Sequence, residues 1–163
     1  MKKFVALLLL TSLCLPMHAL SFEGLQYTLA FAGYQFGMSY DQASSVNAFQ
    51  YTQYFPENAH LVGYIENLLV DETLMDLQVC FRDDKVYKIL ARFDFREMDA
   101  VVERYEALLG PANRMTKDFL NTQGGTINER IYRWSFPDTE INIVRLTSQP
   151  DIAILGFTNK IRP

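Results

Sequence analysis

The sequence predicts an α+β fold, in which an antiparallel sheet carries two helices packed on one face. Residues 75–95 alternate between apolar and polar side chains with a period of two, as the arms of a half-buried β-hairpin do. Residues 98–109 repeat apolar side chains at the spacing of one helix face. Residues 127–157 hold three more apolar stretches separated by turn residues.

The pattern of the hairpin at 75–95 also predicts its register. A two-residue turn at Asp83 and Asp84 would set Val79 against the charge of Lys88. A three-residue turn at 83–85 keeps apolar side chains together. We therefore expect the pairs Phe81–Tyr87, Val79–Ile89 and Leu77–Ala91.

The chain before this hairpin is less regular. Residues 22–36 are apolar and aromatic, and the pattern fits a helix or an edge strand equally well. Ser39 with Gln42 three residues later is a capping box, so we expect a helix from there to about residue 50, ended by 51–56. Residues 60–70 predict a strand with a bulge at 66–67.

The second helix has clear start and stop signals. Asp94 is a candidate N-cap, and Gly110 followed by Pro111 is typical of a helix end. Residues 114–126 are polar, contain Gly124 and Gly125, and are expected to form a loop. Three strands are then predicted at 127–136, 140–146 and 152–157, of which the last is apolar on both sides and therefore either central in the sheet or covered by another layer.

These elements predict a single α+β domain over residues 22–163, built from two halves. Each half, about 39–93 and 94–157, would hold one helix followed by three strands. This order would make a tandem α-β-β-β repeat, of architecture only, since the two halves share little residue identity.

The N-terminus predicts export. Lys2 and Lys3 precede an apolar run, and the small residues Ala19 and Ser21 follow it, which is typical of a secretory signal peptide over residues 1–21. Cleavage after Ala19 is the alternative. The run is about half the roughly 20 residues that a spanning helix needs. We therefore expect a periplasmic or secreted protein without a stable membrane anchor.

Charge and cysteine content exclude several partners. Loss of Lys2 and Lys3 leaves 13 basic and 19 acidic residues from the 15 and 19 of the whole chain, a net charge of −6. An acidic chain without a basic run does not predict binding to nucleic acid or to an anionic membrane. Cys14 leaves with the signal peptide, so Cys80 remains alone and forms no internal disulfide.

The residues of the expected mature chain do not predict an enzyme. One histidine, His60, and one cysteine, Cys80, are too few for a multi-histidine or Cys/His zinc site. Residues 124–125 lack the lysine of a phosphate loop. Residues 71–72 and 83–84 lack the ligand spacing of a calcium loop. We therefore predict no catalytic residue, no cofactor and no metal site.

Two features are candidates for partner binding. Cys80 lies on the even-numbered, charged face of the hairpin, where it would be either an accessible thiol or a small core residue. Tyr132, Trp134 and Phe136 alternate along one predicted strand. They would form either the core of the second half or an exposed aromatic platform for a partner.

Short motifs resemble a known group of proteins. They are Phe31, Gly33, Phe36, Gly37, Met38 and Ser39, then FRDDKVYKI at 81–89, then LLGPA at 108–112. They are similar to small exported bacterial proteins of the outer-membrane assembly lipoprotein (SmpA/OmlA-like) and β-lactamase-inhibitor-protein-like (BLIP-like) group. The resemblance implies helices on one face of an antiparallel sheet and a function in binding other proteins. Leu13 before Cys14 departs from the lipid-attachment signal of the assembly lipoproteins.

We therefore expect an exported, non-enzymatic binding protein of the bacterial cell envelope, whose partner is another envelope or secreted protein. The alternative is a small-ligand carrier or envelope stress protein with an apolar pocket between helices and sheet.

Overall fold

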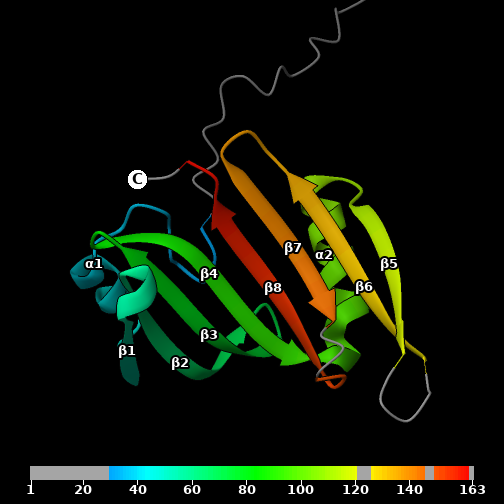
Figure 1. Cartoon of the computed structure of the whole chain (residues 1–163), viewed down its shortest axis with the longest axis horizontal. Coiled ribbons are helices and arrows are strands. Elements are labelled where there is room, and N and C mark those ends of the chain that lie inside the picture. Colours follow the sequence, from blue (N-terminus) through cyan, green and yellow to red (C-terminus); the bar gives the residue numbers. More distant parts are fainter. Residues whose placement is uncertain (1–29, 121–125, 146–148, 162–163) are drawn as a thin grey trace, which may run out of the picture.

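The computed structural model describes residues 30–120, 126–145 and 149–161. The predicted signal peptide and Gly124–Gly125 lie outside these residues. The elements, labelled as in Figure 1, are α1 (Tyr40–Val46), β1 (Tyr51–Phe55), the 3₁₀ turn η2 (Pro56–Asn58), β2 (His60–Val70), β3 (Thr73–Arg82), β4 (Lys85–Asp94), the 3₁₀ turn η3 (Phe95–Glu97), α2 (Met98–Leu109), β5 (Asn113–Leu120), β6 (Thr126–Ser135), β7 (Thr139–Arg145) and β8 (Ile152–Asn159).

All eight described strands form one antiparallel sheet, in the order β1-β2-β3-β4-β8-β7-β6-β5 (Figure 1). The predicted α+β class with an antiparallel sheet is confirmed, and β8 is central, which is one of the two placements expected for it. The central pair β4–β8 joins two four-stranded meanders. Each helix is followed by four strands, so the predicted α-β-β-β order is wrong by one strand in each half.

The two strands that the sequence did not predict, β1 and β5, are the edges of the sheet. Four of the five residues of β1 are exposed, and β5 exposes Arg114, Lys117 and Asp118. An edge strand of this kind buries neither face, so its sequence shows no alternation of apolar and polar residues. The expected helix end at 51–56 and the expected loop at 114–126 are therefore corrected to strands, the second over Asn113–Leu120.

The β3–β4 hairpin has the predicted register along its body but a different turn. Val79 pairs with Ile89 and Leu77 with Ala91, as expected. Asp83 and Asp84 have φ values of 49° and 57°, the left-handed conformation of a two-residue type I′ turn. Phe81 therefore faces Val86, and a bulge next to this pair restores the predicted register. The expected three-residue turn and the Phe81–Tyr87 pair are wrong.

The segment before α1 completes the start of β4. Strand β8 pairs with β4 only from Lys88 onward. At Val86 the backbone N–H donates to the Met38 carbonyl, and the Val86 carbonyl accepts from Gly37 N–H, both at 2.9 Å. Asp84 Oδ1 also accepts a hydrogen bond from the Tyr40 N–H at 3.0 Å. These bonds attach α1 to the tip of the hairpin.

The capping box of α1 is confirmed. Ser39 Oγ accepts from the Gln42 N–H at 3.3 Å, and Gln42 Oε1 accepts from the Ser39 N–H at 2.9 Å. The helix ends at Val46, earlier than expected.

The described part of residues 22–36 is neither a helix nor a strand. Phe31 and Tyr34 exchange backbone hydrogen bonds at 2.9 Å around Ala32 and Gly33, which have φ values of 52° and 87°. This tight turn places Phe31 and Tyr34 in the core, where the Phe31 ring lies 4.8 Å from that of Phe157.

Helix α2 buries a narrower face than its sequence predicts. Its buried residues are Met98, Val101, Val102 and Tyr105. Leu108 was expected on the same face but is 70% exposed. The Asp94 side chain caps η3 by accepting from the Arg96 N–H, so α2 starts one turn later, and Gly110 ends it as predicted.

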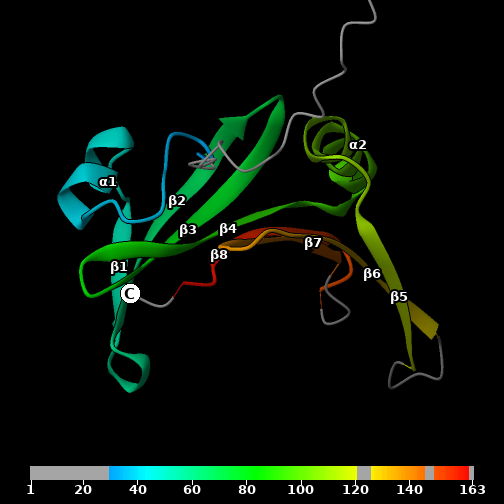
Figure 2. The same cartoon turned by 90° about the horizontal axis from the view of Figure 1, so that it is seen from above.

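Both helices contact the same side of the sheet. Tyr40 of α1 lies 5.6 Å from the Phe81 ring, and Tyr105 of α2 lies 6.0 Å from the Phe157 ring. Phe157, Ile89 and Val79 are neighbours across three strands, and Val79 is two residues from Phe81, so Phe81 and Phe157 share a face. Figure 2 shows α1 and α2 over opposite ends of this face. The other side, on which no described helix lies, is called the helix-free face below.

Candidate functional site

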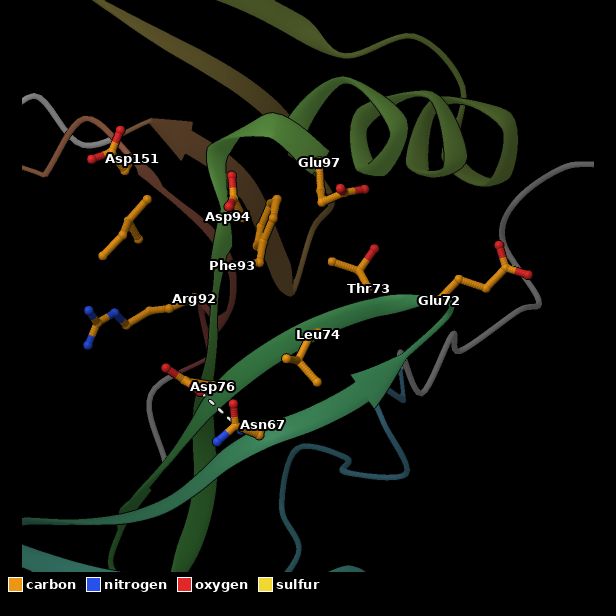
Figure 3. Close-up of a pocket in the computed structure, with 11 residues that line it drawn as sticks. Asn67, Glu72, Thr73, Leu74, Asp76, Arg92, Phe93, Asp94, Glu97 and Asp151 are labelled. Carbon is orange, nitrogen blue, oxygen red and sulfur yellow. Dashed lines mark hydrogen bonds between the residues drawn. The ribbon is translucent and has the colours of Figure 1, made fainter.

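A groove lies where the β2–β3 hairpin separates from the end of β4 (Figure 3). Pairing between β3 and β4 ends at Met75 and Phe93, whereas β4 continues beside β8 to Asp94. The β2 bulge at 66–67, which the sequence predicted, adds to the separation. The resulting cavity has a volume of about 580 Å³. Its walls come from three stretches, within 67–76, 92–97 and 151–152.

Carboxylates dominate the charge of this groove. Its lining holds five acidic side chains and one basic side chain, that of Arg92. Arg96, outside the lining, donates from Nε to Asp94 Oδ1 at 3.0 Å. These side-chain hydrogen bonds lower the pKa of Asp94 to about 2, so Asp94 is an anion at neutral pH and not a proton donor. The five acidic residues are Glu72, Asp76, Asp94, Glu97 and Asp151.

Asp76 is fixed by the bulge beside it. Asp76 Oδ1 accepts a hydrogen bond from the Asn67 backbone N–H at 3.0 Å, and Figure 3 shows this bond on the wall of the groove. Asn67 has a φ of 58°, a left-handed conformation that asparagine tolerates better than most residues. The bulge in β2 thus holds the Asp76 carboxylate at the groove.

The groove also contains a buried threonine and an apolar rim. Thr73 lines the groove and is only 3% exposed. Leu74 is 56% exposed, and Ile152 across the groove is half-buried. Figure 3 shows Thr73 on the same side of the groove as Glu97, with Leu74 nearer to Asp76.

The carboxylates are not arranged as metal ligands. In the described ranges 30–120, 126–145 and 149–161, no three His, Cys, Asp or Glu side chains are grouped as a metal ion requires.

A second surface lies on the helix-free face of β1 and β2. Tyr51 stacks on Tyr64 with ring centroids 4.5 Å apart, and Phe55 stacks on His60 at 4.9 Å. The Tyr87 ring is 6.5 Å from that of His60. We call these five residues the aromatic row. They lie on the helix-free face because Tyr64 and His60 alternate with Leu61 and Gly63, which pack toward the helices.

A cation extends the aromatic row. The Arg82 guanidinium lies 4.6 Å from the centroid of the Tyr87 ring. The row is accessible, since Tyr51 is 49% exposed and the other four rings are half-buried. His60 Nδ1 is buried without a hydrogen-bond partner among the described residues.

Cys80 is on the helix-free face, as predicted, and is buried there. The residue is 6% exposed, with Val62 opposite it in β2 and Lys88 opposite it in β4. Burial raises the pKa of its thiol to about 11. Of the two interpretations offered by the sequence, this favours the small packed residue over the accessible thiol.

The predicted aromatic candidates, two in β6 and Phe136 just after it, lie against the core. Trp134 is 4% exposed, its Nε1 donates to the Gly110 carbonyl at 2.8 Å, and its ring lies 6.1 Å from that of Tyr105. Tyr132 and Phe136 are half-buried against the same core. This placement favours the core interpretation over a binding platform.

Sequence reasoning missed both surfaces for identifiable reasons. The groove carboxylates belong to three separate stretches, and the sequence singled out none of them as a binding group: residues 71–72 were considered as a calcium loop and Asp94 as an N-cap. The alternation of Asp76, Arg92 and Asp94 with core residues was a usable signal, because it predicts one shared face. The aromatic row depends on β1, which was not predicted, so His60 was not grouped with Phe55.

None of the helices in the described part of the chain is long and apolar enough to cross a membrane. Comparison of the chain with protein-family models, with curated proteins and with solved structures found no match.

Proposed function

We propose that this protein is an exported, non-enzymatic binding protein of the bacterial cell envelope that holds another protein against its helix-free face. The observation that carries the proposal is the aromatic row with Arg82 beside it. Tyrosine and arginine are enriched among the residues that dominate binding energy at protein interfaces. Here they gather on one accessible side of a sheet.

The row is already ordered before a partner arrives. Tyr51 stacks on Tyr64 and Phe55 stacks on His60 within the same sheet, so binding costs little further side-chain entropy at these four rings. An immobilised, rotamer-rich side chain otherwise costs about 0.5–1.5 kcal/mol on association. Pre-ordered aromatic side chains lower the entropic cost of binding, which favours a specific protein partner.

The small-ligand carrier has less support. A carrier of apolar molecules needs an apolar cavity. The groove of Figure 3 has a suitable volume, about 580 Å³, but five carboxylates line it. The signal-peptide pattern and the motif resemblance to binding proteins of the SmpA/OmlA-like and BLIP-like group are consistent with the first proposal.

Two tyrosines of β1 provide a matched test of the proposal. Tyr51 and Tyr54 are 49% and 60% exposed, but Tyr51 belongs to the aromatic row and Tyr54 pairs with Leu61, which packs toward the helices. A photo-crosslinking residue at position 51 should capture a specific envelope protein, and one at position 54 should not. Tyr51→Ala should weaken binding of that partner about tenfold, the effect of about 1.4 kcal/mol, whereas Tyr54→Ala should not.

Equal crosslinking from positions 51 and 54 would contradict the assigned face. Purification of the protein with a bound small molecule and without any specific protein partner would favour the carrier instead.

A further inference from the structure

We propose that two copies of this chain associate through β1, which pairs antiparallel with the β1 of the second copy so that the two Gln53 residues face each other. The sheet of one copy then continues into the sheet of the other. This inference goes beyond the proposed function, because it concerns an edge of the sheet and not its helix-free face. The exposure, the composition and the sequence of β1 support it.

Strand β1 has an open outer edge. It is the terminal strand of the described sheet and pairs with β2 on one side only (Figure 1). Four of its five residues are exposed. Its outward N–H and C=O groups pair with no other described strand, and a row of such groups is a template for a further strand.

The two edges of the sheet differ in charge. Strand β1, with the sequence YTQYF, has no charged residue, no proline and no shift in its register with β2. Strand β5, at the opposite edge, exposes Arg114, Lys117 and Asp118. Charged side chains, lysine above all, protect an edge against the addition of another strand. The sequence therefore protects β5 and leaves β1 open.

The sequence of β1 is complementary to itself in the antiparallel direction. With Gln53 opposite the Gln53 of the second copy, Tyr51 faces Phe55 and Thr52 faces Tyr54, so all five residues of both strands are paired. Aromatic residues that face each other across two strands stabilise the pair. A shift by one residue would leave one end unpaired and would set the helix-free face of one copy against the opposite face of the other. This self-complementarity favours a second copy over an unrelated strand.

The same register keeps both helix-free faces on one side of the joined sheet. Tyr51 and Phe55 belong to the aromatic row, and Gln53 lies between them on the same face, where its Oε1 accepts from the Tyr64 hydroxyl at 3.5 Å. Directly opposed residues of antiparallel strands share a face. The aromatic rows of the two copies would therefore meet at Tyr51 and Phe55 and form one longer row.

Strand β1 is held in place before a second copy arrives. The Gln50 N–H donates to the Tyr64 carbonyl at 2.9 Å, and Gln50 Oε1 accepts from the Glu66 N–H at 3.2 Å. Gln50 Nε2 also donates to the Glu66 carbonyl at 3.4 Å. Because the strand is already ordered, pairing costs little further conformational entropy.

The size and charge of the protein predict how the dimer behaves. A strand of five residues gives an interface at the small end of the known range, so we expect a reversible dimer that depends on concentration. Loss of residues 1–21 leaves 13 basic and 19 acidic residues, a net charge of −6 on each copy, which opposes association. Added salt screens this repulsion and should therefore strengthen the dimer. A dimer that salt weakens would contradict pairing through an uncharged edge.

A charge exchange at position 53 tests the proposal by sedimentation equilibrium of the purified protein. Gln53→Lys sets two lysines directly opposite each other, and Gln53→Glu sets two glutamates opposite each other, so each variant should be monomeric at concentrations where the parent protein is dimeric. An equimolar mixture of the two variants sets lysine opposite glutamate and should restore the dimer. Thr116→Lys, at an exposed position of the β5 edge, is the control and should dimerise as the parent protein does.

Cysteine crosslinking tests the register. Gln53→Cys places the two thiols directly opposite each other, whereas Thr52→Cys places them diagonally, with Cβ atoms about 7–8 Å apart. Both positions are exposed, and the native Cys80 is buried. The disulfide-linked dimer should form at least about tenfold faster from position 53 than from position 52, because a disulfide needs Cβ atoms about 4 Å apart. Equal rates at the two positions, or a dimer that neither charge at position 53 weakens, would overturn the proposal.

This proposal and the proposed function fail in different ways. A covalent product of two identical chains is recognised by its mass and counts only toward the dimer. If position 51 captures another protein while the parent protein stays monomeric and position 53 forms no disulfide, the dimer is wrong and the protein-binding function stands. If the dimer forms and no other protein is captured, the function is wrong and the dimer stands.

Discussion

Cys80 shows how a single side chain is shaped by its neighbours in the sheet. It lies between Val62 and Lys88, on the face that no described helix covers, and yet it is 6% exposed. Loss of water around the thiol disfavours the thiolate and raises the pKa from 9.0 to about 11, although the nearby Lys88 acts in the opposite direction. The thiol is thus a packing group at neutral pH and not a nucleophile.

The raised pKa predicts a loss of stability at alkaline pH. Above about pH 9 the unfolded chain releases the Cys80 proton while the folded chain keeps it until about pH 11, so the free energy of unfolding falls in this window. Between about pH 8 and about pH 10.5 the contribution is about 2 kcal/mol. The free energy of unfolding, measured in urea, should fall over this pH range by about 2 kcal/mol less in Cys80→Ala than in the parent protein.

Burial also raises the pKa of Tyr105, so both proteins should lose some stability at high pH and only the difference reports on Cys80. Parallel declines of the two proteins would contradict the assignment.

At the scale of the elements, the sequence predicted the helices and strands that bury one face. The hairpin body was predicted because Val79 and Ile89 alternate with polar residues. Helix α1 was predicted because Ser39 and Gln42 form a capping box. Strands β1 and β5 were missed because an edge strand buries too few side chains for its sequence to alternate between apolar and polar residues. The turn was missed because two successive aspartates in left-handed conformation, Asp83 and Asp84, need a bulge beside them to keep the register.

The groove could be predicted only in part. The bulge at 66–67 and the shared face of Asp76 and Arg92 follow from pattern alone. Asp151 and Ile152 reach the groove because β8 pairs with β4, and nothing local in the sequence specifies that pairing. Long-range strand pairing is thus the missing information.

Helix α2 allows a prediction with an internal control. Val101 is fully buried, whereas Leu108, seven residues later on the same helix, is 70% exposed. Val101→Asp would place an unpaired charge in the core and should cost more than about 4 kcal/mol, enough to prevent folding of a marginally stable domain. Leu108→Asp should change the free energy of unfolding by less than about 0.5 kcal/mol. Circular dichroism and soluble yield of the two variants measure this contrast, and a well-folded Val101→Asp protein would contradict the assigned core.

At the scale of the whole molecule, the two meanders share one sheet and one core. Seven residue pairs join β4 to β8, and Ala91 faces Leu155 in this seam with neither side chain exposed to solvent. The core cluster continues without a break from Tyr34 and Phe81 in the first half to Trp134 in the second. Neither half can unfold alone without exposing the apolar side of the seam.

This shared seam predicts that the protein unfolds in a single cooperative transition. The chain provides one reporter in each half, because Trp134 is its only tryptophan and Cys80 its only cysteine once residues 1–21 are removed. In urea, the midpoint of Trp134 fluorescence should coincide with the midpoint at which a pulse of thiol reagent labels Cys80. Leu155→Ala should lower both midpoints together, by the equivalent of about 2–5 kcal/mol, because it opens a cavity on the seam. Labelling of Cys80 at a urea concentration that leaves the Trp134 signal native would show instead that the halves unfold separately, and that the seam is weaker than its burial indicates.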